Sequence, residues 1–222
     1  MPTRVEISRS LSEKVKAVTL LLLAFFSMGV IGILNPQTRQ LFLKFIPCVV
    51  LFSFFLVLLF HEPVFNRKTS SAFILIAVVC WLIEAMGVST GKIFGDYTYG
   101  SSLGPKLAGT PLLIGINWLL LAYCTAIIGQ SLARGSIERI IISSALMVAY
   151  DFAMELVAPF LGMWHFNNGI APLRNYIAWF ALAMMIHSAL SYSGIRFKNN
   201  IAPSVFIVQL FFFLSLALIT RI

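Results

Sequence analysis

Long apolar runs separated by short polar segments fill the chain from end to end. Seven of these runs have about 20 residues or more, the length a helix needs to cross a hydrocarbon core about 30 Å thick. They cover approximately residues 15–34, 41–60, 71–90, 110–133, 137–161, 173–193 and 201–220. The pattern predicts an all-α integral membrane protein, with a bundle of about seven transmembrane helices that forms one domain over residues 1–222.

Composition supports this assignment and excludes two other classes. Hydrophobic residues make up 59% of the 222 residues and charged residues only 11%, whereas soluble globular proteins carry about 25% charged residues. A water-soluble domain and a disordered chain are therefore excluded. The formal net charge is +8, but the basic residues are scattered through short loops, so the charge does not indicate nucleic-acid binding.

The distribution of Lys and Arg predicts the orientation. More of them occur at the N-terminus and in the loops on its side of the bundle than on the opposite side. By the positive-inside rule, we expect a cytoplasmic N-terminus and an external C-terminus, in the cytoplasmic membrane of a bacterium.

One connection differs from the others by its glycines. The segment Gly91–Gly109, between the third and fourth runs, contains five glycines together with Asp96, Tyr97, Tyr99 and Lys106. We expect a re-entrant loop, which is tolerated at membrane depth only where protein covers the backbone. The alternative is an interfacial loop with both tyrosines at the bilayer surface.

Ionisable residues inside the runs are the first functional candidates, because they are costly in a bilayer. At about 1.5 Å per residue, Glu84 and Asp151 each lie about 20 Å along their runs, which point in the same direction. Asn117, on the returning fourth run, reaches the same level. Just above this layer we expect five more polar or aromatic side chains, namely Asp96, Trp164, Asn175, Tyr176 and Trp179.

Asp151 and Glu155 are four residues apart, so their carboxyl groups share one helix face and repel each other. We expect the pair to share a proton, which would make a carboxylic acid available. The alternative is a structural role, in which these acids bond neighbouring helices or pair with Arg174 or Lys106. Trp81 and Trp118 are candidates to line a pocket beside these acids, or to pack without a functional role.

Two stretches resemble a known family. They are TGKIFGDYTYGSSLGPKLAGTPLLIGINWLLL (Thr90–Leu121) and MVAYDFAMELVAPFLGMWHFNNGIAPLRNYIAWF (Met147–Phe180). Both are similar to membrane-bound carotenoid biosynthesis proteins, which include carotenoid 1,2-hydratases that act on γ-carotene-type and bisanhydrobacterioruberin-type ends. The likeness covers most of residues 84–180.

The resemblance implies addition of water, without a cofactor, across the terminal double bond of an acyclic ψ end group. Asp151, Glu155, Glu84 and Asp96 are then the expected catalytic residues, with Glu84 or Asp96 positioning water. Expected partners are the carotenoid, water, membrane lipid and other carotenoid enzymes. Substrate contacts are expected from Tyr97, Tyr99, Lys106, Asn117, Trp118, Trp81, Trp164, Asn175, Tyr176 and Trp179.

Three other functions remain open at this point. A carotene cyclase or isomerase would begin with the same protonation, and a proton-coupled transporter would also contain buried acids. A prenyltransferase would need Asp-rich motifs to hold magnesium and diphosphate. The three cysteines lie within apolar runs without metal-binding spacing, so we expect no metal site.

Overall fold

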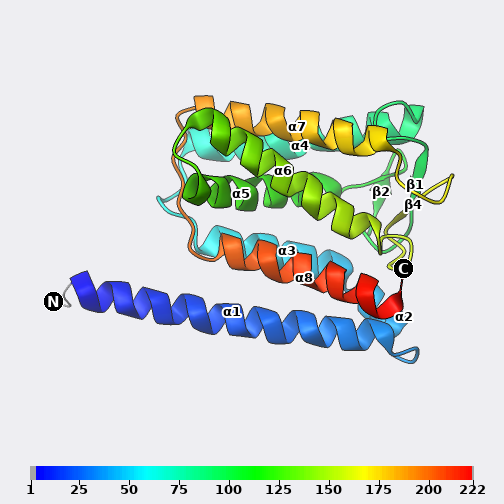
Figure 1. Ribbon diagram of the computed structural model, residues 1–222, viewed down its shortest axis with the longest axis horizontal. Helices are drawn as coiled ribbons and strands as arrows, with labels where there is room; N and C mark the ends of the chain where they lie inside the picture. Colours follow the sequence, from blue (N-terminus) through cyan, green and yellow to red (C-terminus); the bar gives the residue numbers. More distant parts are fainter. Residues whose placement is uncertain (1–3, 222) are drawn as a thin grey trace.

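The architecture is a bundle of helices with short strands at one end (Figure 1). The computed structural model describes residues 4–221, with side chains described from residue 12 onward. The helices in this part of the chain are α1 (Arg4–Leu34), α2 (Arg39–Lys44), α3 (Ile46–Leu59), α4 (Arg67–Thr90), α5 (Ile114–Leu132), α6 (Ser136–Glu155), α7 (Leu173–Tyr192) and α8 (Ala202–Thr220).

Several helices have the length and composition of membrane spans. Four described segments meet both criteria, namely Ser12–Leu34, Arg67–Thr90, Ile114–Leu132 and Ala202–Thr220, and α3 is a shorter apolar helix. Large apolar side chains are exposed along α1, α3 and α4, where they would contact lipid. The chain is therefore an all-α integral membrane protein, as its hydropathy pattern predicts.

Prolines explain where the helices depart from the expected runs. The second run is divided into α2 and α3 at Phe45, since Pro47 has no N–H to donate to the carbonyl of Leu43. The fourth run becomes helical only at Ile114, after Pro111. The fifth run stops being helical at Glu155 and continues as turns to residue 161, because Pro159 cannot donate to the carbonyl of Glu155.

Helix α5 is the centre of the bundle and packs against α3, α4, α6, α7 and α8. Two glycines allow its closest contacts. A Cβ atom at Gly115 would overlap the carbonyl oxygen of Ala77 on α4, and one at Gly129 would overlap the Ser143 hydroxyl on α6. Small residues commonly permit such close approach between membrane helices.

Two pairs of short antiparallel strands lie at one end of the bundle (Figure 1). Strand β1 (Tyr97–Tyr99) pairs with β4 (Trp164–Phe166), with Thr98 opposite His165. Strand β2 (Lys106–Leu107) pairs with β3 (Thr110–Pro111). The β1–β4 pair joins the Gly-rich segment 91–109 to the loop between α6 and α7, so residues 65 to 69 positions apart meet at the helix ends.

We expect Gly115→Ala to destabilise the protein, because its Cβ meets backbone atoms of α4 that cannot rotate away. Thermal unfolding in detergent checks this. Gly29→Ala is the matched control, since its Cβ on α1 meets only the edge of the Phe212 ring, at 3.3 Å. Equal melting temperatures for the two variants would contradict the close α4–α5 packing.

Candidate active site

Three carboxylic side chains from two helices line a small cavity under the β1–β4 strands. The cavity has a volume of about 20 Å³ and contains Glu84 of α4 with Asp151 and Glu155 of α6. Its other lining residues come from the loops and from α5, α6 and α7: Phe94, Tyr97, Tyr99, Ile114, Asn117, Met154, Trp164, Phe166, Asn175 and Trp179. The structure thus brings together Glu84, Asp151 and Asn117, the residues that helix depth places in one layer.

Glu84 is bound by three donors. Its Oε2 accepts hydrogen bonds from the hydroxyls of Tyr97 (2.6 Å) and Tyr99 (2.9 Å), and its Oε1 accepts one from Nε1 of Trp118 (2.8 Å). Both oxygens therefore act as acceptors, the arrangement expected of an ionised carboxylate.

Strand geometry explains why both tyrosines reach the same carboxylate. Tyr97 and Tyr99 are two residues apart on β1, so they point to the same face, while Thr98 points outward to His165. Burial, followed by the negative charge of Glu84, raises the pKa of both tyrosine hydroxyls well above the usual value. Both hydroxyls therefore keep their protons and remain donors.

The second pair of acids is connected by one amide. Nδ2 of Asn175 on α7 donates to Oδ2 of Asp151 at 2.8 Å and makes a long contact to Oε1 of Glu155 at 3.5 Å. Glu155 also accepts a hydrogen bond from Nε1 of Trp164 at 3.0 Å. The carboxyls of Asp151 and Glu155 therefore share one face of α6, as their spacing predicts.

Asp151 has one oxygen without a protein partner. The residue is completely buried, yet its Oδ1 forms no hydrogen bond within the described residues. Leaving such an atom unsatisfied costs about 1–3 kcal/mol. A water molecule needs roughly 10–15 Å³ of accessible space and two or more polar neighbours, so the cavity of about 20 Å³ can hold one.

Trp179 lines the cavity, whereas Trp118, an expected substrate contact, packs against Trp179 and is not among the lining residues. The rings of Trp118 and Trp179 stack with centroids 3.8 Å apart and an interplanar angle of 20°. Phe94 packs against both Trp118 and Tyr97. Because aromatic faces attract cations, the cavity-lining rings of Phe94 and Trp179 suit a positively charged intermediate.

Sequence comparison identifies the family. The profile described as "Carotenoid biosynthesis protein" matches residues 45–221, which is most of the chain. The chain belongs to the carotenoid biosynthesis protein family. It is also 28% identical over 131 residues to the bisanhydrobacterioruberin hydratase of Haloarcula japonica, over 53% of this chain and 43% of the relative. The aligned region is therefore less than half of that relative, and no solved structure matches the chain.

Not every expected site residue of this family member lies at the cavity. Asp96 is exposed and accepts a hydrogen bond from Asn167 at 2.7 Å. Lys106 is also exposed and donates to the carbonyl of Tyr99. Trp81 donates to the carbonyl of Pro111 at 3.1 Å, and Tyr176 packs against Phe152.

Four apolar cavity residues were not among the expected ones: Phe94, Ile114, Met154 and Phe166. Phe166 had a detectable signal, because it is two residues after Trp164 and therefore shares its face of a strand. Met154 directly precedes Glu155 on α6. Nothing in their sequence environment distinguishes Phe94 and Ile114 from ordinary core residues.

The described part of the chain contains no cluster of side chains arranged to bind a metal ion. No three His, Cys, Asp or Glu side chains there lie close enough together to hold one ion.

We expect the double substitution of Tyr97 and Tyr99 by Phe to lower the melting temperature. It leaves Oε2 of Glu84 buried without a donor, at a cost of about 1–3 kcal/mol. Tyr176→Phe is the matched control, since the Tyr176 hydroxyl has no hydrogen bond among the described residues. If the double variant melted like this control, Oε2 of Glu84 would not depend on the two hydroxyls.

Proposed function

We propose that this protein hydrates the terminal 1,2 double bond of an acyclic ψ carotenoid end group to a tertiary alcohol, without a cofactor. Family membership supports carotenoid biosynthesis, and the relative from Haloarcula japonica is named as a hydratase. The observation that carries the proposal is the unpartnered Oδ1 of Asp151 in a cavity large enough for one water molecule.

The hydrogen bonds support different roles for the acids. Glu84 has three donors and no remaining need for a proton, so it serves as the fixed negative charge. Asp151 has one free oxygen and lies on the same helix face as Glu155. Repulsion between two carboxylates at this spacing favours one shared proton. Asp151 is therefore the proton donor, and Glu155 is its partner.

The reaction balances without an external reagent. The Asp151 carboxyl transfers its proton to the CH carbon of the terminal double bond, which leaves a tertiary cation on the neighbouring carbon. Glu84 and the ring of Trp179, which lines the cavity, stabilise this cation. Water then forms the new C–O bond, and its extra proton returns to Asp151 or Glu155.

Asn117 is suited to position the water. Its side chain lines the acid cavity, and its amide forms no hydrogen bond within the described residues. An amide has both donor and acceptor capacity, so it can orient a water molecule whose other partner is Asp151. We assign this role to Asn117 rather than to Asp96, which is exposed and bound to Asn167.

The membrane arrangement is part of the proposal. In this arrangement α1 and α3 to α8 cross the bilayer as one domain, with a cytoplasmic N-terminus and with the β1–β4 end of the bundle at the outer face. The Gly-rich segment then enters the bundle from that face and delivers Tyr97 and Tyr99 to Glu84.

We expect Asp151→Asn to abolish product formation while the protein still accumulates in membranes, because the amide keeps the shape but cannot supply the acid. Pigment analysis in a host that makes a ψ-ended carotenoid measures this. Glu138→Gln, an exposed acid-to-amide change on the same helix, should leave activity intact. A folded Asp151→Asn variant with wild-type turnover would remove Asp151 as the donor.

Isotope labelling tests the reaction type. Purified protein supplied anaerobically with a ψ-ended carotenoid should yield a product heavier by one water, with heavy oxygen from labelled water in the new hydroxyl. In heavy water, one non-exchangeable deuterium should appear on the adjacent carbon. A product of unchanged mass would indicate a cyclase or isomerase instead, and a requirement for oxygen would also refute hydration.

A further inference from the structure

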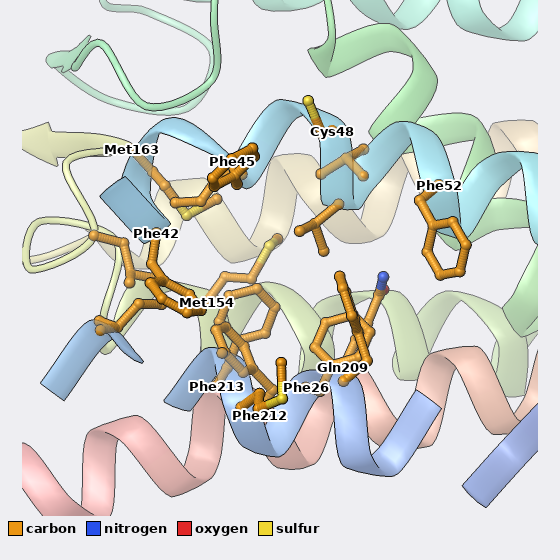
Figure 2. A pocket seen from close by; sticks show the side chains of 18 of the residues that line it. Phe26, Phe42, Phe45, Cys48, Phe52, Met154, Met163, Gln209, Phe212 and Phe213 are labelled. Carbon is orange, nitrogen blue, oxygen red and sulfur yellow. The ribbon is translucent and has the colours of Figure 1, made fainter. Parts of the chain in front are cut away.

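A second, larger cavity lies between α1, α3, α6 and α8. It has a volume of about 520 Å³ and no charged side chain in its described lining. Figure 2 shows Phe26, Phe52, Phe212 and Phe213 around this space, with Met154 beside them. Aromatic rings and methionine sulfur are polarisable surfaces that suit a flat, conjugated chain.

The cavity is open toward the surroundings of the bundle. Several of its lining side chains are exposed, among them Phe25 and Met28 of α1, Phe45, and Phe52 of α3. Since these helices carry apolar side chains on their outer surfaces, the opening faces lipid. A hydrophobic molecule can therefore enter from the bilayer without passing through water.

Most polar groups in the wall already have partners. The Tyr150 hydroxyl donates to Oε1 of Gln209 at 2.8 Å, and Nε2 of Gln209 donates to the Ser53 hydroxyl at 2.9 Å. The Ser53 hydroxyl in turn donates to the carbonyl of Val49 at 2.9 Å. This chain of bonds leaves an apolar surface, which suits a hydrocarbon ligand.

The large cavity adjoins the acid cavity. Asn117 of α5 and Met154 of α6 line both spaces. A chain lying in the large cavity with its end at these two residues would bring that end to Asp151. Met154 is then the apolar contact at the junction, and Asn117 is the polar one.

We propose that the large cavity binds one end of a conjugated polyene and directs its terminal double bond past Met154 to Asp151. This inference rests on the proposed function. At roughly 30 Å³ for each group the size of a water molecule, the cavity of about 520 Å³ accommodates on the order of 15 to 20 groups. One end of a forty-carbon chain therefore fits, and the rest stays in the bilayer.

Cys48 reports occupancy directly. It lines the large cavity and is exposed, whereas Cys80 and Cys124 are buried. In lipid nanodiscs, lycopene should slow alkylation of Cys48 by N-ethylmaleimide about tenfold at a concentration about ten times its Kd. The Asp151→Asn variant is used so that the ligand is not converted. No protection by lycopene, or equal protection by the saturated hydrocarbon squalane, would overturn the proposal.

Kinetics provide a second readout. Gly29 lines the cavity, and its Cβ would lie 3.3 Å from Phe212. Gly29→Leu should raise KM about tenfold and leave kcat nearly unchanged, because it obstructs the chain but not the acids. Ile31→Phe is the control, an enlargement at an exposed position of the same helix outside the cavity.

The two proposals fail in different ways. Protection of Cys48 by lycopene in a protein that forms no hydrated product would retain the cavity and refute the hydratase. Hydration with unprotected Cys48 and wild-type kinetics in Gly29→Leu would retain the hydratase and refute the cavity. If Gly29→Leu does not fold, protection of Cys48 decides the question.

Discussion

Carboxyl groups held away from water inside a helix bundle are the constraint on which the rest of this structure depends. Each buried acid needs donors, and the chain supplies them from distant segments. Tyr97 and Tyr99 come from the Gly-rich loop and Trp118 from α5, while Asn175 comes from α7. These donors are held in place by three features of the fold. They are the pairing of β1 with β4, the central position of α5, and the stacking of Trp118 of α5 on Trp179 of α7.

The acids do not have equal numbers of hydrogen-bond partners, and the proposed chemistry depends on this difference. Glu84 has three donors, and in the proposed mechanism it is the ionised acid. Oδ1 of Asp151 has no partner among the described residues, so it leaves room for a proton and a water molecule. A fully bonded cluster would be only a structural link between helices. The proposed polyene cavity would bring an alkene to the incompletely bonded acid, so the two spaces would act as one site.

The sequence predicted those features that have a local cause. Glu84 and Asp151 could be identified as site candidates because a charged side chain is costly inside a bilayer. The rise per residue of a helix then predicted that Asn117 lies at the same depth. Contacts between segments distant in the sequence could not be predicted in this way. Asp96 pairs with Asn167 across two loops, which no local pattern reveals. The large cavity also has no sequence signature, because its lining comes from helices far apart in the sequence, chiefly α1, α3, α6 and α8.

The central claim is that Asp151 carries the proton while Glu84 is ionised. Infrared difference spectroscopy tests it, because a protonated carboxyl has a carbonyl stretching band distinct from that of a carboxylate. The account predicts a band that shifts in heavy water, disappears in Asp151→Asn and persists in Glu84→Gln. Loss of the band in Glu84→Gln and its persistence in Asp151→Asn would contradict the account.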